Sequence, residues 1–104
     1  MNNQNVNFNI GSVQTALKNY HDSIGKETKP YHFINEARLI RYAMTGDFKT
    51  IFDYKNLTRE KQRVLRRVLC MDCRLIKSHV DYKLRKQTCR ELVIKHSEKT
   101  NSNT

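Results

Sequence analysis

Basic side chains are concentrated in one stretch of the chain, where their types and number suit the binding of a polyanion. Residues 55–95 hold 13 Lys or Arg against four Asp or Glu, a net charge of +9 out of the +10 of the whole 104-residue chain. A positive field confined to one stretch is typical of a surface that binds nucleic acid. Basic residues also fill ordinary solvated helix faces, so composition alone does not decide between the two.

The spacing of the arginines supports the binding interpretation. Arg63, Arg66, Arg67, Arg74 and Lys77 recur at intervals that place them on one side of a helix. A guanidinium group binds phosphate through two parallel hydrogen bonds and keeps its charge at every physiological pH. We therefore predict a surface that binds nucleic acid, either DNA or RNA, or an acidic protein. Its predicted residues are Lys61, Arg63, Arg66, Arg67, Arg74, Lys77, Lys83, Arg85, Lys86 and Arg90.

Tyr82 lies beside this basic run and could stack on a nucleic-acid base. A tyrosine near the start of a helix more often packs half-buried against its neighbours. Packing is the favoured interpretation for Tyr82.

Cysteine and histidine provide the only candidate metal ligands. Cys70, Cys73, His79 and Cys89 are of the types that hold zinc in a tetrahedral site. The Cys70 and Cys73 pair, however, falls inside a strong helical pattern, whereas zinc-binding pairs usually lie in a tight turn, and cysteine is common in buried cores. We expect no metal or other cofactor, and three reduced thiols, buried or half-buried, as in a cytoplasmic protein.

Catalysis and membrane insertion have little support in the sequence. The acidic residues are few and scattered, His21 and His32 flank a linker without a nearby nucleophile, and there is no Gly-rich phosphate loop. No apolar run approaches the roughly 18–20 residues of a membrane span, and the first residues lack the pattern of a signal peptide. We expect a cytoplasmic protein that is not an enzyme and does not contact a membrane.

The elements that must position these residues are all helical. The Asn-rich start and the polar end predict disordered tails at residues 1–10 and 98–104, around one helical domain at residues 11–97. Apolar residues at helical spacing predict a single compact all-α bundle of about four main helices and one short helix.

The first half of the domain contains two predicted helices. Ser12 is expected to cap a helix over residues 12–24 that Gly25 ends, and a second helix is expected from about Tyr31 to Gly46, after Pro30. Residues 47–53 predict a short helix or a tight buried turn. The apolar side chains of this segment, expected to fill the core, are Phe48, Ile51 and Phe52.

The second half contains the two basic helices. Thr58 is expected to cap a long helix over about residues 58–78, and Asp81 a last helix that ends near His96. The long helix should bury the side that contains Leu65, Val68, Met71 or Asp72, Leu75 and Ile76. The two helices could form a helix-turn-helix, although the first is long and the usual glycine is missing from the turn. A homodimer through the apolar side of the long helix is a further possibility, because the core is small.

Short motifs across about residues 33–87 resemble a known family. They run over residues 35–40 (NEARLI), 45–49 (TGDFK), 72–76 (DCRLI) and 81–86 (DYKLRK). This pattern is similar to the helical module that accompanies DNA-binding domains in phage antirepressors of the KilA-N and Bro type. The resemblance implies a phage or prophage origin and a role in regulation or host takeover.

Charge and resemblance together lead to two functional expectations. The first is a small phage or prophage-type regulatory protein that binds nucleic acid through a basic helical face. The alternative is an antirepressor-like or inhibitor-like factor whose positive face docks on an acidic surface of a host or phage protein, because electrostatic attraction would serve that equally well.

Overall fold

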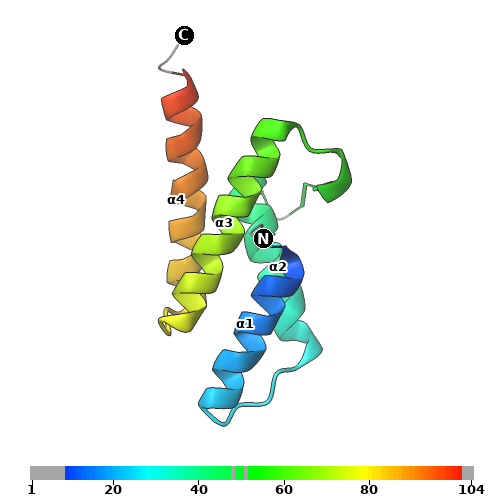
Figure 1. Ribbon diagram of the computed structural model, residues 1–104, viewed down its shortest axis with the longest axis vertical. Coiled ribbons are helices and arrows are strands. Elements are labelled where there is room, and N and C mark those ends of the chain that lie inside the picture. Colours follow the sequence, from blue (N-terminus) through cyan, green and yellow to red (C-terminus); the bar gives the residue numbers. More distant parts are fainter. Residues whose placement is uncertain (1–8, 48, 51, 102–104) are drawn as a thin grey trace, which may run out of the picture.

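Four α-helices and one 3-10 helix make up the described part of the chain. The computed structural model describes residues 9–47, 49–50 and 52–101. In chain order the elements are α1 (Ile10–Ser23), α2 (Pro30–Thr45), the 3-10 helix η2 (Tyr54–Asn56), α3 (Arg59–Lys77) and α4 (Tyr82–Asn101), as Figure 1 shows. Within these residues there is no strand, so the predicted all-α class and the predicted number of helices are confirmed.

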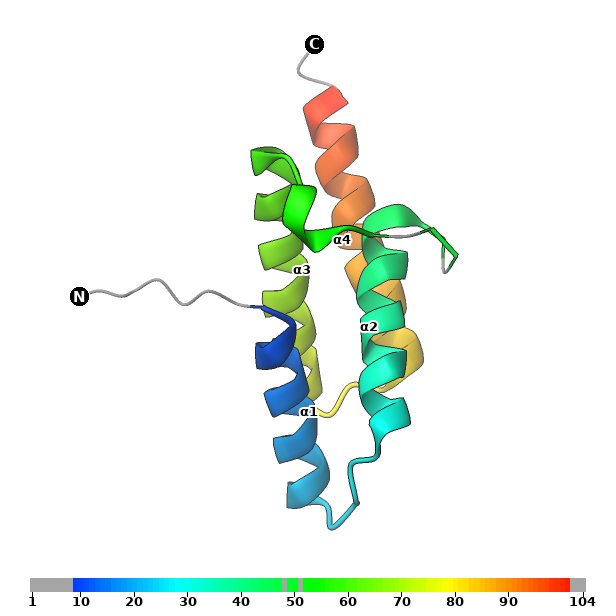
Figure 2. The same cartoon turned by 90° about the vertical axis from the view of Figure 1, so that its right-hand side faces the viewer.

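The helices form two layers. Figure 2 shows α1 and α3 on one side of the molecule and α2 and α4 on the other. Helix α3 packs against α1, α2 and α4, and α2 likewise packs against the other three helices. Helices α3 and α4 lie side by side in opposite directions, joined by a short turn (Figures 1 and 2). This is an αα-hairpin, and the steep crossing of a helix-turn-helix is not formed.

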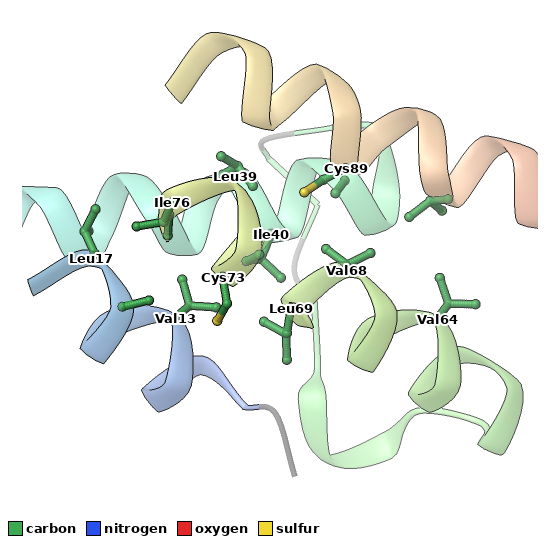
Figure 3. Packing of buried hydrophobic residues seen from close by; sticks show 13 residues of the cluster. Val13, Leu17, Leu39, Ile40, Val64, Val68, Leu69, Cys73, Ile76 and Cys89 are labelled. Carbon is green, nitrogen blue, oxygen red and sulfur yellow. The ribbon is translucent and has the colours of Figure 1, made fainter. Parts of the chain in front are cut away.

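All four helices contribute to one apolar core, part of which Figure 3 shows. Its fully buried aliphatic side chains include Val13, Leu39, Ile40, Val68 and Ile76, each 0% exposed. Burying a side chain of this kind stabilises the fold by roughly 1.5–3 kcal/mol. The α1, α2 and α4 helices cover the apolar side of α3. That side is therefore not available for the homodimer that the sequence left possible.

The buried side of α3 was predicted in part. Val68, Asp72 and Ile76 are buried as expected, whereas Leu65, Met71 and Leu75 are only half-buried. Val64, Leu69 and Cys73 are buried instead, because α3 contacts helices on both of its flanks and so buries a wider arc than one stripe.

Local capping explains where the helices start. The prediction that Ser12 caps α1 is wrong: Asn9 is the cap, and its side chain accepts a hydrogen bond from the Ser12 backbone N–H (3.1 Å) while the Ser12 hydroxyl accepts one from the Asn9 N–H (3.3 Å). Thr58 and Asp81 are confirmed as caps, since they accept hydrogen bonds from the backbone N–H groups of Lys61 (3.2 Å) and Leu84 (2.8 Å).

The helix ends differ from the prediction at one place. Gly25 and Gly46 adopt the left-handed conformation (φ 73° and 79°) and end α1 and α2 as expected. Helix α4 continues to Asn101, so the end predicted near His96 is wrong and the helix passes the domain boundary predicted at residue 97. The remaining predicted tail residues, 1–8 and 102–104, lie outside the described residues.

Among the described residues between α2 and η2, none is helical. Of the three side chains expected to fill the core, Phe48 and Ile51 lie outside the described residues, and Phe52 is half-buried with its ring edge-on to Tyr54 (4.8 Å between centroids). None of the helices described is both long and apolar enough to cross a membrane.

Candidate nucleic-acid interface

A buried charged triad fixes how three of the helices face one another. The Arg85 guanidinium on α4 donates hydrogen bonds to Glu36 on α2 (Nη2 to Oε1, 2.5 Å) and to Asp72 on α3 (Nε to Oδ1, 3.1 Å). Its third contact is the Val80 carbonyl oxygen in the turn before α4 (Nη1 to O, 3.0 Å). Glu36, Asp72 and Arg85 are at most 5% exposed. The triad therefore ties α2, α3 and α4 together at one point of the core.

One proton balances the charge of the triad. Burial, followed by the hydrogen bond to Asp72 and the charge of Asp72, raises the pKa of Glu36 to about 9 against the opposing effect of Arg85. Glu36 Oε2 and Asp72 Oδ2 are both buried without another donor, and a proton on Glu36 lets these two oxygens share a hydrogen bond. The triad is then neutral at pH 7, so it adds nothing to the positive field at the surface.

Because Asp72 points into the core, the cations on the opposite side of α3 point away from it. Arg74 lies two residues after Asp72, which is roughly 200° around an α-helix, so it points outward. The other exposed cations on this side of α3 follow at three-residue and four-residue spacing. The α3 stripe consists of Arg59, Arg63, Arg66, Arg67, Arg74 and Lys77, all exposed. From Arg59 to Lys77 it runs roughly 27 Å, at about 1.5 Å per residue.

The charges of the α3 stripe are not neutralised by neighbouring acids. Within the described residues, none of its six side chains has a carboxylate oxygen within 4.0 Å. The two acids of α3 are engaged elsewhere, Asp72 in the triad and Glu60 in a hydrogen bond with His96 of α4. The positive field of the stripe therefore faces solvent with little internal compensation.

A groove of mixed polar and apolar lining borders one end of the α3 stripe. It has a volume of about 550 Å³, lies between α1 and α3, and is lined among others by Ser12, Thr15, Asn19 and Lys77. Hydroxyl and amide side chains commonly bond to phosphate and sugar groups beside the cations that attract them. The groove thus extends the candidate interface from α3 onto α1.

Five of the ten predicted binding residues lie outside the α3 stripe, and two of these five, Arg85 and Lys61, do not belong to any exposed basic surface. Arg85 was predicted as a binding residue, and this is wrong: it is 5% exposed because Glu36 and Asp72 hold it in the core. Lys61 is exposed, but at roughly 100° per residue it lies on the side of α3 that contains Val64 and Val68. It lines a separate cleft of about 720 Å³ near the end of α4, and not the stripe.

The predicted basic residues of α4 form a second group. Lys83 is exposed and Lys86 and Arg90 are half-buried, and all three lie on the flank of α4 nearer to α2. The Arg90 guanidinium donates a hydrogen bond to the Ala43 carbonyl oxygen at the end of α2 (3.0 Å), and Lys86 Nζ lies 5.5 Å from the centre of the Tyr42 ring. The single continuous surface predicted from the sequence is therefore divided between two layers of the bundle.

Tyr82 packs against its neighbours, which was the interpretation favoured from the sequence. Its half-buried ring lies against α2, and its hydroxyl donates a hydrogen bond to the Asn35 carbonyl oxygen (3.1 Å). Lys86 Nζ lies 6.0 Å from the centre of the ring. Tyr82 thus joins α4 to α2.

Sequence reasoning missed three features of this region. Arg59 precedes Arg63 by four residues, so its spacing already placed it in the α3 stripe. Arg85 is in helical register with Cys89 and Leu92, which would have placed it on the packed side of α4. The approach of Arg38 and Tyr42 to α4 had no local signal, because it depends on how α2 and α4 pack.

The candidate zinc ligands are not brought together. Within the described residues, no group of three or more His, Cys, Asp or Glu side chains is arranged to hold a metal ion. Cys73 and Cys89 are buried, Cys70 is half-buried, and all three are free thiols, as expected. Burial raises the pKa of Cys73 to about 11 and that of Cys89 to about 12, so neither is a reactive thiolate at neutral pH.

His21 and His32 meet across the linker between α1 and α2, with their ring centres 4.5 Å apart. His21 is buried and hydrogen-bonded to the Thr28 hydroxyl (2.8 Å). Burial, and then the nearby His32, lower the pKa of His21. These contacts hold the linker against α1.

Comparison with known proteins gives no relative: no protein family, no curated protein and no solved structure matches the chain.

Proposed function

We propose that this protein is a small regulatory protein that binds nucleic acid through the α3 stripe. The observation that carries the proposal is the row of six exposed cations on one side of α3, with no acidic partner among the described residues. Five of the six are arginines, which suit the bidentate recognition of phosphate. The row contacts the backbone of the nucleic acid, so it provides affinity without reading the sequence.

The regulatory part of the proposal has a separate basis. It rests on the resemblance of residues 33–87 to phage antirepressor modules, whose motifs in this chain include Glu36, Gly46, Asp72 and Arg85. These residues hold the bundle together and do not lie on the α3 stripe. A cytoplasmic location, where nucleic acid is accessible and thiols stay reduced, is part of the same proposal.

The test is the salt dependence of binding. Six phosphate contacts predict that the logarithm of the association constant falls against the logarithm of salt concentration with a slope of about −5. Fluorescence anisotropy with a duplex of about two turns (roughly 20 bp) and with RNA of the same length should show affinity falling about 10³-fold from 50 to 200 mM salt. A flat salt response, or no binding to either polymer, would contradict the proposal.

Pull-down from a lysate distinguishes the alternative partner. If the α3 stripe binds nucleic acid, nuclease treatment should remove whatever the purified protein recovers. A protein that is still recovered after nuclease treatment, and is lost when Arg63, Arg66, Arg67 and Arg74 are changed to Glu, would place an acidic protein surface on the stripe instead.

A further inference from the structure

A second group of cations lies on the other layer of the bundle, along the contact between α2 and α4. The seam patch consists of Arg38, Tyr42, Tyr82, Lys83, Lys86 and Arg90. Arg38 and Lys83 are exposed, and Lys86 lies near two aromatic rings, those of Tyr42 and Tyr82. Burial raises the pKa of the Tyr82 hydroxyl, and the positive charge of Arg38 is close enough to lower it in part. These contacts place Lys86 beside both tyrosines and Arg38 near Tyr82, while Arg90 is held at the end of α2.

The triad shows that the seam patch and the α3 stripe face in different directions. Glu36 and Asp72 point toward each other through Arg85. Arg38 lies two residues after Glu36, and Arg74 lies two residues after Asp72. Each is thus roughly 200° around its own helix from the triad, so Arg38 points outward from α2 and Arg74 outward from α3. Figure 2 shows α2 and α3 in separate layers.

The core separates the two surfaces. Leu39 and Ile40 on α2 and Val68 on α3 are completely buried between the layers. A straight duplex that lies along the α3 stripe cannot pass through this core to reach Arg38 or Lys83. One nucleic-acid segment therefore cannot neutralise both surfaces unless it bends around the bundle.

We propose that the seam patch binds a second nucleic-acid segment, so that one molecule bridges two duplexes. This inference rests on the proposed function of the α3 stripe. Phosphates would be attracted by Arg38, Lys83 and Lys86. Arg90 adds its positive charge to the patch while its guanidinium stays hydrogen-bonded at the end of α2. Tyr82 and Tyr42 position Lys86 through the contacts already described.

A capture experiment with two duplexes tests the bridge. One duplex is tethered to beads, the protein is added to saturation, unbound protein is washed away, and a fluorescent second duplex is supplied at low salt. The seam variant is Arg38→Glu, Lys83→Glu and Lys86→Glu, with Arg90 left unchanged because it binds the end of α2. The matched control is Lys18→Glu, Lys26→Glu and Lys29→Glu, and circular dichroism checks that both variants keep the helical content of the wild type.

The wild type and the control should capture the second duplex. The seam variant should bind the tethered duplex within about threefold of wild type but capture at least about tenfold less of the second duplex. Capture that persists in the seam variant would overturn the inference, because a dimer presenting two α3 stripes would then be the bridge. A wild type that binds the tethered duplex and captures no second one would overturn the bridge alone. Failure to bind even the tethered duplex would overturn the proposed function as well.

Discussion

Glu36 and Asp72 place two carboxyl groups against one guanidinium in the core, and this arrangement should make stability depend on pH. The folded protein keeps a proton on Glu36 up to about pH 9, whereas the ordinary pKa of this side chain is 4.5. Between these values the unfolded chain binds fewer protons than the folded one. The contribution of Glu36 to the free energy of unfolding therefore falls as the pH rises from 4.5 to 9.

The variant Glu36→Gln should remove this dependence. A glutamine keeps an oxygen to accept the Arg85 hydrogen bond and offers an N–H to Asp72 Oδ2, so it imitates the protonated glutamate without titrating. Urea unfolding between pH 5 and 9 should show the variant gaining stability over the wild type as the pH rises. Glu91→Gln, at an exposed position, should follow the wild-type profile. Parallel profiles for Glu36→Gln and the wild type would contradict the shared proton.

Gly46 provides a second test of a side-chain contact between helices. A Cβ at Gly46 would lie 2.8 Å from Arg90 Nη2, and the residue also has a left-handed φ of 79°. Gly25 has a similar φ of 73°, but a Cβ there would meet nothing within 4 Å. Gly25→Ala should therefore cost only the backbone strain, on the order of 1 kcal/mol, and Gly46→Ala should cost more because moving the Arg90 guanidinium aside breaks its hydrogen bond to the Ala43 carbonyl oxygen.

The extra cost at Gly46 should depend on Arg90. In an Arg90→Ala background, Gly46→Ala and Gly25→Ala should reduce the free energy of unfolding by similar amounts, because the guanidinium is no longer in the way. Thermal or urea unfolding of the single and double variants measures this. Equal costs in the wild-type background would show that Arg90 does not pack on Gly46.

Substitutions on the exposed side of α3 should weaken nucleic-acid binding and leave the stability of the fold almost unchanged. Replacing one stripe arginine, such as Arg63→Gln, should reduce the magnitude of the salt slope for nucleic-acid binding by about 1 and leave stability within about 0.5 kcal/mol. Lys49→Gln, outside α3 and also exposed, is the control and should leave the slope unchanged. An unchanged slope for every stripe variant would show that these side chains do not contact phosphate.

Features that depend on nearby residues could be predicted from the sequence of each helix. Thr58 and Asp81 cap the two basic helices, and Gly25 and Gly46 end the two helices before them, because caps and left-handed turns act within one turn of chain. The exposed side of α3 followed from the three-residue and four-residue spacing of its arginines. The same reasoning missed the cap at Asn9, which lies just before the first apolar positions.

Features that depend on packing between distant residues could not be predicted. Arg85 reaches a partner 49 residues away in Glu36 and another 13 residues away in Asp72, and only these contacts explain why an arginine is buried. The division of the basic residues into the α3 stripe and the seam patch has the same origin. The net charge can be counted from the sequence, but the position of each basic side chain on the surface depends on the fold.

The most direct test of the whole account compares two variants of equal net charge. The stripe variant changes Arg63, Arg66, Arg67 and Arg74 to Glu, and the control changes Lys18, Lys26, Lys29 and Lys49 to Glu. Each lowers the net charge from +10 to +2, since every reversal changes it by two. Both sets are exposed, so both variants should fold.

Duplex binding at 50 mM salt decides between a local surface and a general charge effect. The stripe variant should bind at least about 100-fold more weakly than the wild type, and the control within about tenfold, because the stripe arginines contact phosphate directly and the four control lysines do not. Equal losses in the two variants would contradict the account, since affinity would then follow net charge and not the α3 stripe.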